Sequence, residues 1–528
     1  MEYYLVPTTV LSLSIVLVSI LITTWAWKVL NWVWLRPNQI ESCLRRQGLR
    51  GNSYRILFGD SKESSMATSR AESKTLNLLS DAVAPRVLPF IHRTVEKYGE
   101  NSFVWVGPIA RGNIMNTEYL REIFTKIDVF QKPEANPFIK TLITGLIMHN
   151  GEKWVKHRRI LNAAFNLEKL KHMLPAIYAS CCEMIISKWE KLVSEEGSCE
   201  VDACTYFDNL TADVISRTVF GSNYEEGRKL FQLQEELVKL SIKASDIVNI
   251  PGWRLLRTKP NKKLKEVNGE IDTLLKNMIN KKEKAIRAGE AAVDDDLLSI
   301  LLESNFKEIE EHGNKKDVGM SIKDIIEECK VFYFAGRETT SSLLVWTIVL
   351  LSRHPNWQAR AREEVLQVFG ANNIPDYDGL QRLKVVTMIL HEVLRLYPPA
   401  TTVDRTVQKK TQLGELSLPA GAQVELPITL VHHDTKLWGD NANEFRPERF
   451  ADGISKATNG RVAFLPFGWG PRICIGQNLA MIQAKLVLSM ILQRFDFELS
   501  PSYTHAPCRA ISLRPQYGAP FVIHKHLY

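Results

Sequence analysis

A cysteine near the end of the chain stands in a setting that suits a thiolate. Cys474 follows the run Phe467–Arg472, which is rich in Gly and Pro, and an apolar helical pattern continues from Asn478 to Phe495. The N–H groups of such a turn, with the dipole of the helix beginning there, stabilise a negative sulfur and lower the pKa of the thiol. Arg472 offers paired donors to a carboxylate. For a thiol taken alone, a buried and inert cysteine is the alternative.

This loop resembles the haem-binding loop of the cytochrome P450 superfamily, and every fixed position of that motif is matched. The matching residues are Phe467, Gly470, Arg472, Cys474 and Gly476. The resemblance implies that Cys474 is the axial ligand of a haem b iron, because thiolate ligation is how these haems activate oxygen. It also implies that Arg472, Phe467 and Gly476 lie against the haem.

A long helix is predicted in the second half of the chain. Ser321 and Asp324 have the spacing of a helix cap, and the helical pattern continues to Arg353. A helix of about 30 residues is roughly 45 Å long, enough to cross a whole domain. Its middle, Phe332–Leu351, is almost wholly apolar, which predicts that the helix is buried.

Two charged residues, Arg337 and Glu338, interrupt this apolar helix and argue against a second membrane span. The segment Ala335–Thr340 resembles the oxygen-activation motif of the superfamily. That resemblance implies that Gly336 gives room for the haem and that the Thr339 hydroxyl holds dioxygen or a water. Glu338 would deliver protons from solvent into a dry pocket. A kinked core helix is the alternative for this motif taken alone.

Two further sites resemble haem-propionate contacts. Trp154 and Arg158 are four residues apart, so they share one face of a predicted helix. They match the Trp-x-x-x-Arg helix of the superfamily, although an amphipathic helix with a solvated basic edge explains the same pattern. His157 points elsewhere and is given no role. Arg405, on a strand predicted at residues 401–406, resembles another propionate partner.

A structural lock is predicted from Glu392 and Arg395, which lie three residues apart on one helix face. In the superfamily such a pair is buried and is joined by an arginine like Arg449. Because a buried ion pair is costly to break, loss of Glu392 should prevent folding or haem retention. An exposed pair on a helix surface is the alternative.

The N-terminus carries an apolar run of membrane-spanning length. No charged residue lies between Glu2 and Lys28, and Leu5–Trp27 is rich in Leu, Ile and Val. Tryptophans at its far end match an interfacial belt, namely Trp25, Trp27, Trp32 and Trp34. The basic residues that follow predict that the body of the protein stays in the cytosol. A cleaved signal peptide is the alternative, but no Ala-x-Ala site closes the run.

These patterns divide the chain into a membrane anchor at 1–30, a linker at 31–61 in which Arg36-Pro37 ends the helix, and one catalytic domain at 62–528. The resemblance implies a fold that is mostly α with small β-sheets. The net charge of +8 over 528 residues is modest. It argues against nucleic acid and fits a membrane surface or an acidic partner. Eight scattered cysteines without a CxxC pair indicate reduced thiols.

The resemblance narrows to one plant subgroup, the seventy-two family, which includes secologanin synthase and other oxidases of iridoids, triterpenoids and gibberellins. The segments that carry it are Trp34–Pro37, Gln47–Arg55 and Gly319–Trp346. It implies a monooxygenase of the endoplasmic reticulum membrane that uses O2 on a small hydrophobic terpenoid. No nucleotide-binding fingerprint appears, so electrons from NADPH are expected through the flavins of NADPH-cytochrome P450 reductase, with cytochrome b5 as an optional donor. Two other classes remain: a haem-thiolate isomerase or dehydratase that needs no reductase, and a haem-binding protein without catalysis.

The sequence leaves the substrate and the position of oxidation open. The loops around Phe130–Met148 and Leu230–Ile250 are expected to shape the pocket. Ala400–Val403 and Ala506–Ala510 should lie near the substrate. The apolar stretch Ile247–Leu256 is either a core edge or a second membrane contact.

Overall fold

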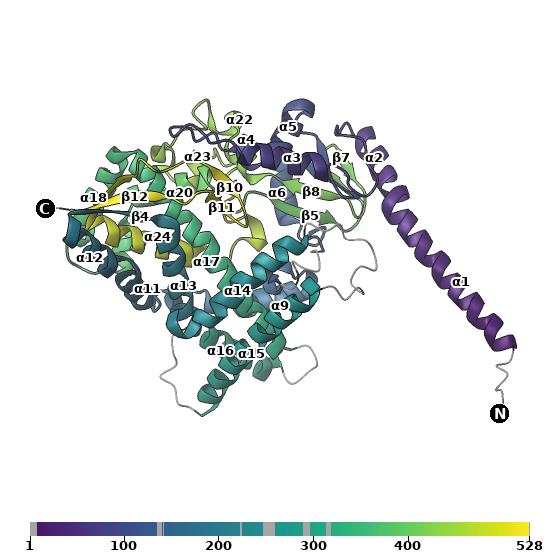
Figure 1. The fold of residues 1–528 in the computed structure, drawn as a ribbon, viewed down its shortest axis with the longest axis horizontal. Helices are drawn as coiled ribbons and strands as arrows, with labels where there is room; N and C mark the ends of the chain where they lie inside the picture. Colours follow the sequence, from purple (N-terminus) through teal and green to yellow (C-terminus); the bar gives the residue numbers. More distant parts are fainter. Residues whose placement is uncertain are drawn as a thin grey trace.

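A computed structural model describes residues 8–134, 140, 142–221, 224–245, 259–288, 296–312 and 318–526. Figure 1 shows a body of packed helices with small sheets, from which one long N-terminal helix projects. This confirms the predicted class, mostly α with small β-sheets behind an apolar N-terminal helix. The segment Ile247–Leu256 lies outside the described residues, as do parts of both predicted pocket loops.

The N-terminal helix is longer than the sequence predicted. It runs without a break through α1 (Thr8–Leu30), the π-helical turn η1 (Asn31–Leu35) and α2 (Arg36–Arg46). Arg36-Pro37 was expected to end the helix, but the helix continues through it, because the π-helical turn η1 just before Pro37 replaces the regular i→i−4 bonding with i→i−5 bonding. Residues 36–46 therefore continue the helix within the stretch expected to be a linker.

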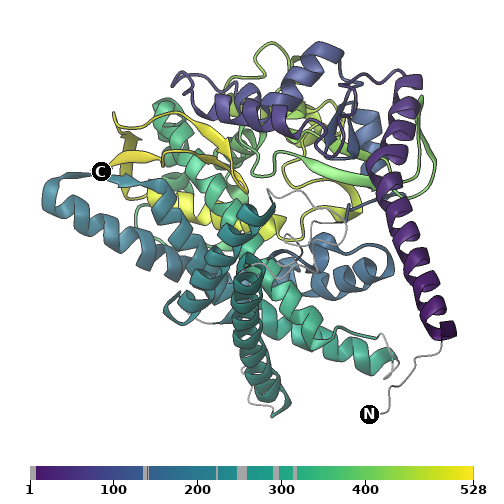
Figure 2. The same cartoon turned by 45° about the vertical axis from the view of Figure 1, so that its right-hand side comes forward.

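The two ends of this helix have different surroundings. Residues 13–46 form a helix with a mean hydropathy of 1.9 in its most apolar part, and that part has no buried residue. It is long and apolar enough to cross a membrane. By contrast, α2 buries Pro37, Ile40 and Leu44. In both Figure 1 and Figure 2 the helix leaves the body beside the sheet.

The main sheet has five strands and carries one of the predicted haem contacts. Its order is β1 (Phe103–Val106), β2 (Ile109–Asn113), β8 (Gln423–Leu426), β5 (Val403–Val407) and β3 (Phe130–Gln131). The β2–β8 pair is parallel and the other pairs are antiparallel. Arg405 lies in the middle of β5, opposite Val424 of β8, and its side chain is buried.

Three smaller sheets complete the β structure of the described residues. They are β4–β12–β9 (Ser198–Asp202, Pro520–Lys525, Phe495–Leu499), β10–β11 (Pro507–Arg509, Leu513–Pro515) and β6–β7 (Thr411–Leu413, Leu416–Leu418). Strand β10 lies within Ala506–Ala510, the segment expected near the substrate.

The centre of the body is α17 (Ile322–Arg353), the long helix that the sequence predicted. Ser321 and Asp324 form its capping box, and every residue from Thr340 to Leu351 is buried. The helix α13 (Ala203–Phe220) packs along it. Around this pair lie α9 (Gly151–Ala164), α20 (Val385–Leu396) and α24 (Gln477–Leu492), which position the candidate site.

The remaining helices cover this centre. In the first half of the chain they are α3 (Ser61–Glu72), α4 (Ala84–Val87), α5 (Pro89–Tyr98), α6 (Thr117–Thr125), α8 (Gly145–Met148), α10 (Leu167–Lys171), α11 (Leu174–Cys181), η2 (Cys182–Ile186), α12 (Ser187–Glu196) and α14 (Tyr224–Ser245). In the second half they are α15 (Lys259–Arg287), α16 (Leu297–His312), α18 (Pro355–Phe369), α19 (Tyr377–Arg382), α21 (Ile428–His432), α22 (Thr435–Trp438), η4 (Pro447–Phe450), α23 (Ile454–Ala457) and η5 (Gly470–Arg472).

Candidate active site

The cysteine loop is a tight turn that delivers Cys474 to the start of α24. Gly468 and Gly470 have φ angles of 73° and 70°, a region that favours glycine. A Cβ atom on Gly470 would also lie 2.8 Å from the carbonyl oxygen of Phe124. The Cys474 N–H donates to the Phe467 carbonyl at 2.9 Å, which closes the turn.

The Cys474 thiol is exposed, yet protein atoms crowd around it. Desolvation raises the pKa of the thiol, while the Gly476 N–H group and the charge of Arg158 act in the opposite direction. A bound iron would deprotonate such a thiol. A Cβ atom on Gly476 would lie 4.0 Å from the Cys474 sulfur, so the glycine keeps the approach to the sulfur open.

The structure brings the predicted Trp154 and Arg158 to the cysteine loop from α9. Arg158 donates from Nη1 to the Ile473 carbonyl at 2.7 Å, directly before the cysteine. The Arg472 guanidinium lies 4.5 Å from the centre of the Trp154 ring. Both residues of the Trp-x-x-x-Arg pattern therefore contact the loop, which a solvated helix edge would not do.

Three cations gather on one side of this loop. Desolvation and the nearby Arg472 charge lower the pKa of Arg405 to about 10, and desolvation lowers that of Arg472 to about 10. Lys132 is partly buried, and desolvation and then both arginines lower its pKa to about 7. An anionic group between these side chains would relieve their mutual repulsion.

The residues present fit a haem. One thiol faces an approach kept open by a glycine, and the cations beside it match the two propionate groups. The Nε atoms of Arg405 and Arg472 are buried without a hydrogen-bond partner, so each still has a donor to offer. Lys132 was missed by sequence reasoning, because a single lysine after a short strand carries no signal of its own.

On α17, Thr339 and Gly336 do not share the same surroundings. The Thr339 side chain is exposed in the middle of a mostly buried helix, and its hydroxyl donates to the Ala335 carbonyl at 2.7 Å. Gly336 faces α13, where a Cβ atom would lie 2.4 Å from Cδ1 of Ile215. The space that Gly336 leaves is thus occupied by Ile215 of the packed helix, whereas the sequence interpretation reserved it for the haem.

Glu338 is bonded to residues far away in the chain. Its carboxylate accepts from Arg514 Nε at 2.9 Å and from the Ser512 hydroxyl at 2.7 Å. Arg514 also pairs with Asp208 of α13 at 2.7 Å. Although desolvation lowers it, these two carboxylates hold the pKa of Arg514 above its ordinary value. Glu338 therefore belongs to a network that joins α17, α13 and β11.

The predicted lock is present and buried. Arg395 donates to both oxygens of Glu392, at 2.8 and 2.7 Å, and both side chains are fully buried. Arg449 of η4 lies 3.6 Å from the same carboxylate and donates to the Trp438 carbonyl at 2.9 Å. The pair is therefore not the exposed surface pair that was the alternative.

A second buried pair was not predicted from the sequence. His157, to which no role was given, lies with Nδ1 2.6 Å from Glu328 of α17, and both side chains are fully buried. The other Glu328 oxygen accepts from the Leu146 N–H group at 3.0 Å. The segment after Leu146 supplies the His149 carbonyl, which accepts from Arg472 at 2.9 Å. Glu328 thus connects α17 to the backbone that holds Arg472.

Comparison with known proteins agrees with this geometry. A sequence model of the family described as Cytochrome P450 matches residues 82–516. Cytochrome P450 72A397 of Kalopanax septemlobus is 58% identical over 501 residues, 95% of each chain. Secologanin synthase 1 of Catharanthus roseus is 53% identical over 509 residues, 96% of each chain. The 11-oxo-beta-amyrin 30-oxidase of Glycyrrhiza uralensis is 50% identical over 515 residues, 97% of each chain. The chain therefore belongs to the cytochrome P450 family, whose members are haem monooxygenases.

Proposed function

We propose that this protein is a membrane-anchored cytochrome P450 that hydroxylates, or oxidises further, a terpenoid such as an iridoid, a triterpenoid or a gibberellin. Secologanin synthase 1 and 11-oxo-beta-amyrin 30-oxidase, each matched over nearly its full length, support this substrate class. The observation that carries the proposal is the cysteine loop, which joins one accessible thiol to cations with unused donors.

Haem bound at this loop would supply the oxygen-activating iron, ligated by Cys474. Arg405, Arg472 and Lys132 would hold the two propionates. Arg158 and the Gly476 N–H group favour the thiolate over the thiol. Trp154 keeps the Arg472 guanidinium in place by stacking against it, and Phe467 shapes the turn through its carbonyl.

Proton movement is assigned to Thr339 and Glu338. The Thr339 hydroxyl can give up its bond to the Ala335 carbonyl and donate to oxygen or to a water. Glu338 can exchange a proton with the Ser512 hydroxyl, which lies 2.7 Å away, while Arg514 holds the carboxylate in position. Gly336 lets α13 pack closely, so it positions this part of α17.

The partners follow from the same assignment. Electrons come from NADPH-cytochrome P450 reductase, with cytochrome b5 as a second donor, so NADPH and flavins act only through the reductase. Residues 1–30 anchor the protein in the endoplasmic reticulum membrane, 31–61 connect, and 62–528 form the catalytic domain in the cytosol. Lys28 and Arg36 at the inner end of the apolar run support this orientation.

The test has two stages. The purified full-length protein is first reduced under carbon monoxide, and a strongly red-shifted Soret band is expected that C474A abolishes. It is then incubated with reductase, NADPH and a panel of iridoids, triterpenoids and gibberellins. Product that needs both NADPH and reductase supports the proposal. Product formed from a peroxide without reductase would indicate an isomerase or dehydratase, and no oxygen uptake with any compound would indicate haem binding without catalysis.

A further inference from the structure

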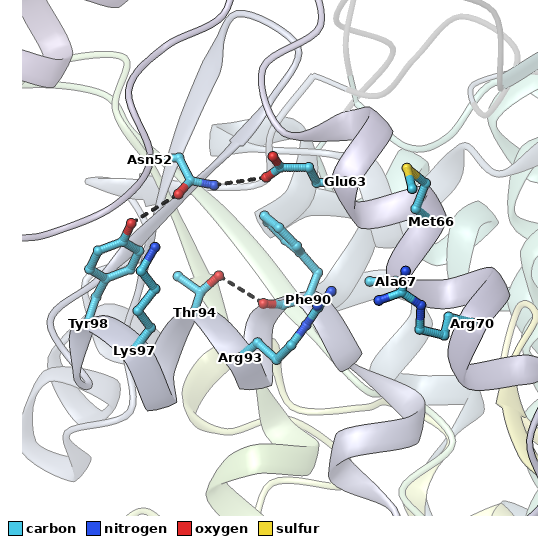
Figure 3. Close-up of a pocket in the computed structure, with 10 residues that line it drawn as sticks. All are labelled: Asn52, Glu63, Met66, Ala67, Arg70, Phe90, Arg93, Thr94, Lys97 and Tyr98. Carbon is cyan, nitrogen blue, oxygen red and sulfur yellow. Dashed lines mark hydrogen bonds between the residues drawn. The ribbon is translucent and has the colours of Figure 1, made fainter.

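A second candidate site lies on the surface between α3 and α5. Figure 3 shows the side chains that line this cavity, whose volume is about 370 Å³. None of the residues assigned above to the haem site lines it. It therefore calls for an explanation separate from the oxidation chemistry.

The cavity is positively charged. Arg70 of α3 and Arg93 and Lys97 of α5 line it, and none of these has a carboxylate partner among the described residues. Arg93 Nε makes one long hydrogen bond of 3.4 Å to the Pro89 carbonyl. Lys97 Nζ lies 4.6 Å from the centre of the Tyr98 ring. The acidic residue of the cavity, Glu63, is already paired with Arg55 at 2.6 Å. Such a surface attracts an anion with several acceptor oxygens.

One side of the cavity is apolar. Met66, which lines it, is 54% exposed, and Phe90 lies across from it in Figure 3. Ile56 and Phe58, in the loop just before α3, are 52% and 54% exposed. Exposed apolar side chains next to cations are the surface expected where a protein meets charged headgroups and the first part of the acyl chains.

The wall of the cavity is attached to the anchor helix. Tyr54 donates from its hydroxyl to the Val33 carbonyl at 2.8 Å, and Val33 lies between two tryptophans of the predicted interfacial belt. Asn52, two residues before Tyr54, lines the cavity and accepts from Tyr98 at 3.0 Å. The cavity is thus held close to the level at which the anchor helix leaves the bilayer.

We propose that this cavity binds the phosphate group of an anionic phospholipid. Arg70, Arg93 and Lys97 would hold the phosphate oxygens, and the acyl chains would leave past Met66 toward the membrane. A free phosphate presents the same anion without the chains, so the experiment must separate the two sources.

The experiment uses the full-length, haem-loaded protein in neutral detergent and measures binding by calorimetry. The probes are dihexanoyl phosphatidate, dihexanoyl phosphatidylcholine and inorganic phosphate. The test variant is R70Q/R93Q/K97Q. The matched control is K409Q/K410Q/K456Q, which removes the same charge from exposed lysines elsewhere on the body. An unchanged carbon monoxide spectrum shows that each variant is folded. If the triple variant does not give this spectrum, the single variant R93Q is used in its place.

Phosphatidate is expected to bind the wild type and the control equally, and the test variant on the order of tenfold more weakly, since each cation near an anionic headgroup contributes. Phosphatidylcholine and inorganic phosphate should bind all three proteins weakly. Equal losses in the test and control variants would overturn the proposal in favour of general charge attraction. Inorganic phosphate binding as tightly as phosphatidate would overturn the lipid as the source. An affinity of the test variant for phosphatidate that equals that of the wild type would overturn the proposal outright.

Discussion

Two buried arginines, Arg395 and Arg405, differ in how completely their donors are bonded. Arg395 is buried with Glu392 and also donates to the backbone carbonyls of His432 and Ala442, each at 2.7 Å. Arg405 is equally buried, but it donates to one carbonyl, and its Nε has no partner. Because buried donors are normally satisfied within the fold, the first arrangement holds the protein together and the second leaves capacity for an anionic ligand.

The pKa of Arg405 agrees with its unused donor. Desolvation lowers the pKa of Arg405 to about 10, because no carboxylate makes a close hydrogen bond to it and Arg472 adds a like charge. The haem-free protein therefore carries an electrostatic cost at this position that a propionate would offset. The comparison predicts that substitutions in the Glu392–Arg395 pair lower the stability of the fold, whereas substitutions at Arg405 weaken haem binding.

The largest effect is expected from E392Q. This change leaves Arg395 buried beside a neutral partner, and breaking a buried pair costs about 3–5 kcal/mol of unfolding free energy. Chemical denaturation of the protein should show this loss, together with loss of the thiolate haem spectrum. E448Q is the control, because Glu448 is 53% exposed and its pair with Arg446 is on the surface. A stable, haem-loaded E392Q protein would show that the Glu392–Arg395 pair is not needed to hold the fold together.

A smaller and different effect is expected from R405Q. Its haem should transfer to apomyoglobin on the order of tenfold faster, since a charged hydrogen bond is worth about 1.5–3 kcal/mol. The haem-free protein should be as stable as the wild type or more so, because a desolvated charge has been removed. R461Q, at an exposed position, should change neither quantity. If R405Q unfolds as readily as E392Q, Arg405 belongs with the lock.

The pH dependence of the stability of the haem-free protein tests whether Lys132 is also a cation without a partner carboxylate. Because the pKa of Lys132 is lowered to about 7, the folded state loses this proton before the unfolded state does. The unfolded chain then holds more protons from pH 7 up to the ordinary lysine pKa of about 10.4, so stability should rise with pH over that window. K132M should flatten the rise in denaturation curves measured across this range. An identical rise in the haem-loaded protein would mean that no propionate lies near Lys132.

The smallest effect on stability is expected from T339A. The Thr339 hydroxyl bonds only within its own helix among the described residues, so its loss should change stability by less than about 0.5 kcal/mol. Its effect should appear in turnover instead. With reductase present, NADPH should still be consumed, but more of it should yield hydrogen peroxide than product. Product formation fully coupled to NADPH in T339A would contradict the role given to this hydroxyl.

The parts of the site that could be predicted are local in sequence. The cysteine loop, the cap of α17 and the Glu392–Arg395 pair each depend on residues within a few positions of one another. Pairs between distant residues could not be predicted from the residues themselves, because their partners are set by packing. Arg449 was expected beside Glu392 only because the superfamily has such an arginine. Glu338 and Arg514 are 176 residues apart, and His157 and Glu328 are 171 apart. Neither pair has a spacing that a single sequence could reveal.

Two local predictions differ from the structure for physical reasons. Arg36-Pro37 looked like a helix end, but the π-helical turn η1 before Pro37 changes the bonding pattern there, and the helix continues into α2. Gly336 was expected to make room for a cofactor, but the nearest atom to its missing side chain is Cδ1 of Ile215 on α13. For Gly336 the residue type was recognised, but the neighbour that needs it lies in another element.

The unbroken helix from α1 into α2 connects the apolar segment of membrane-spanning length rigidly to the catalytic body. Because α2 packs on the body through Pro37, Ile40 and Leu44, the anchor helix is not joined to the body by a flexible linker. Any tilt that the bilayer imposes on the apolar segment is passed to the body as a rigid rotation. Membranes of different thickness tilt such helices differently, so lipid composition would set the angle between the catalytic body and the membrane plane.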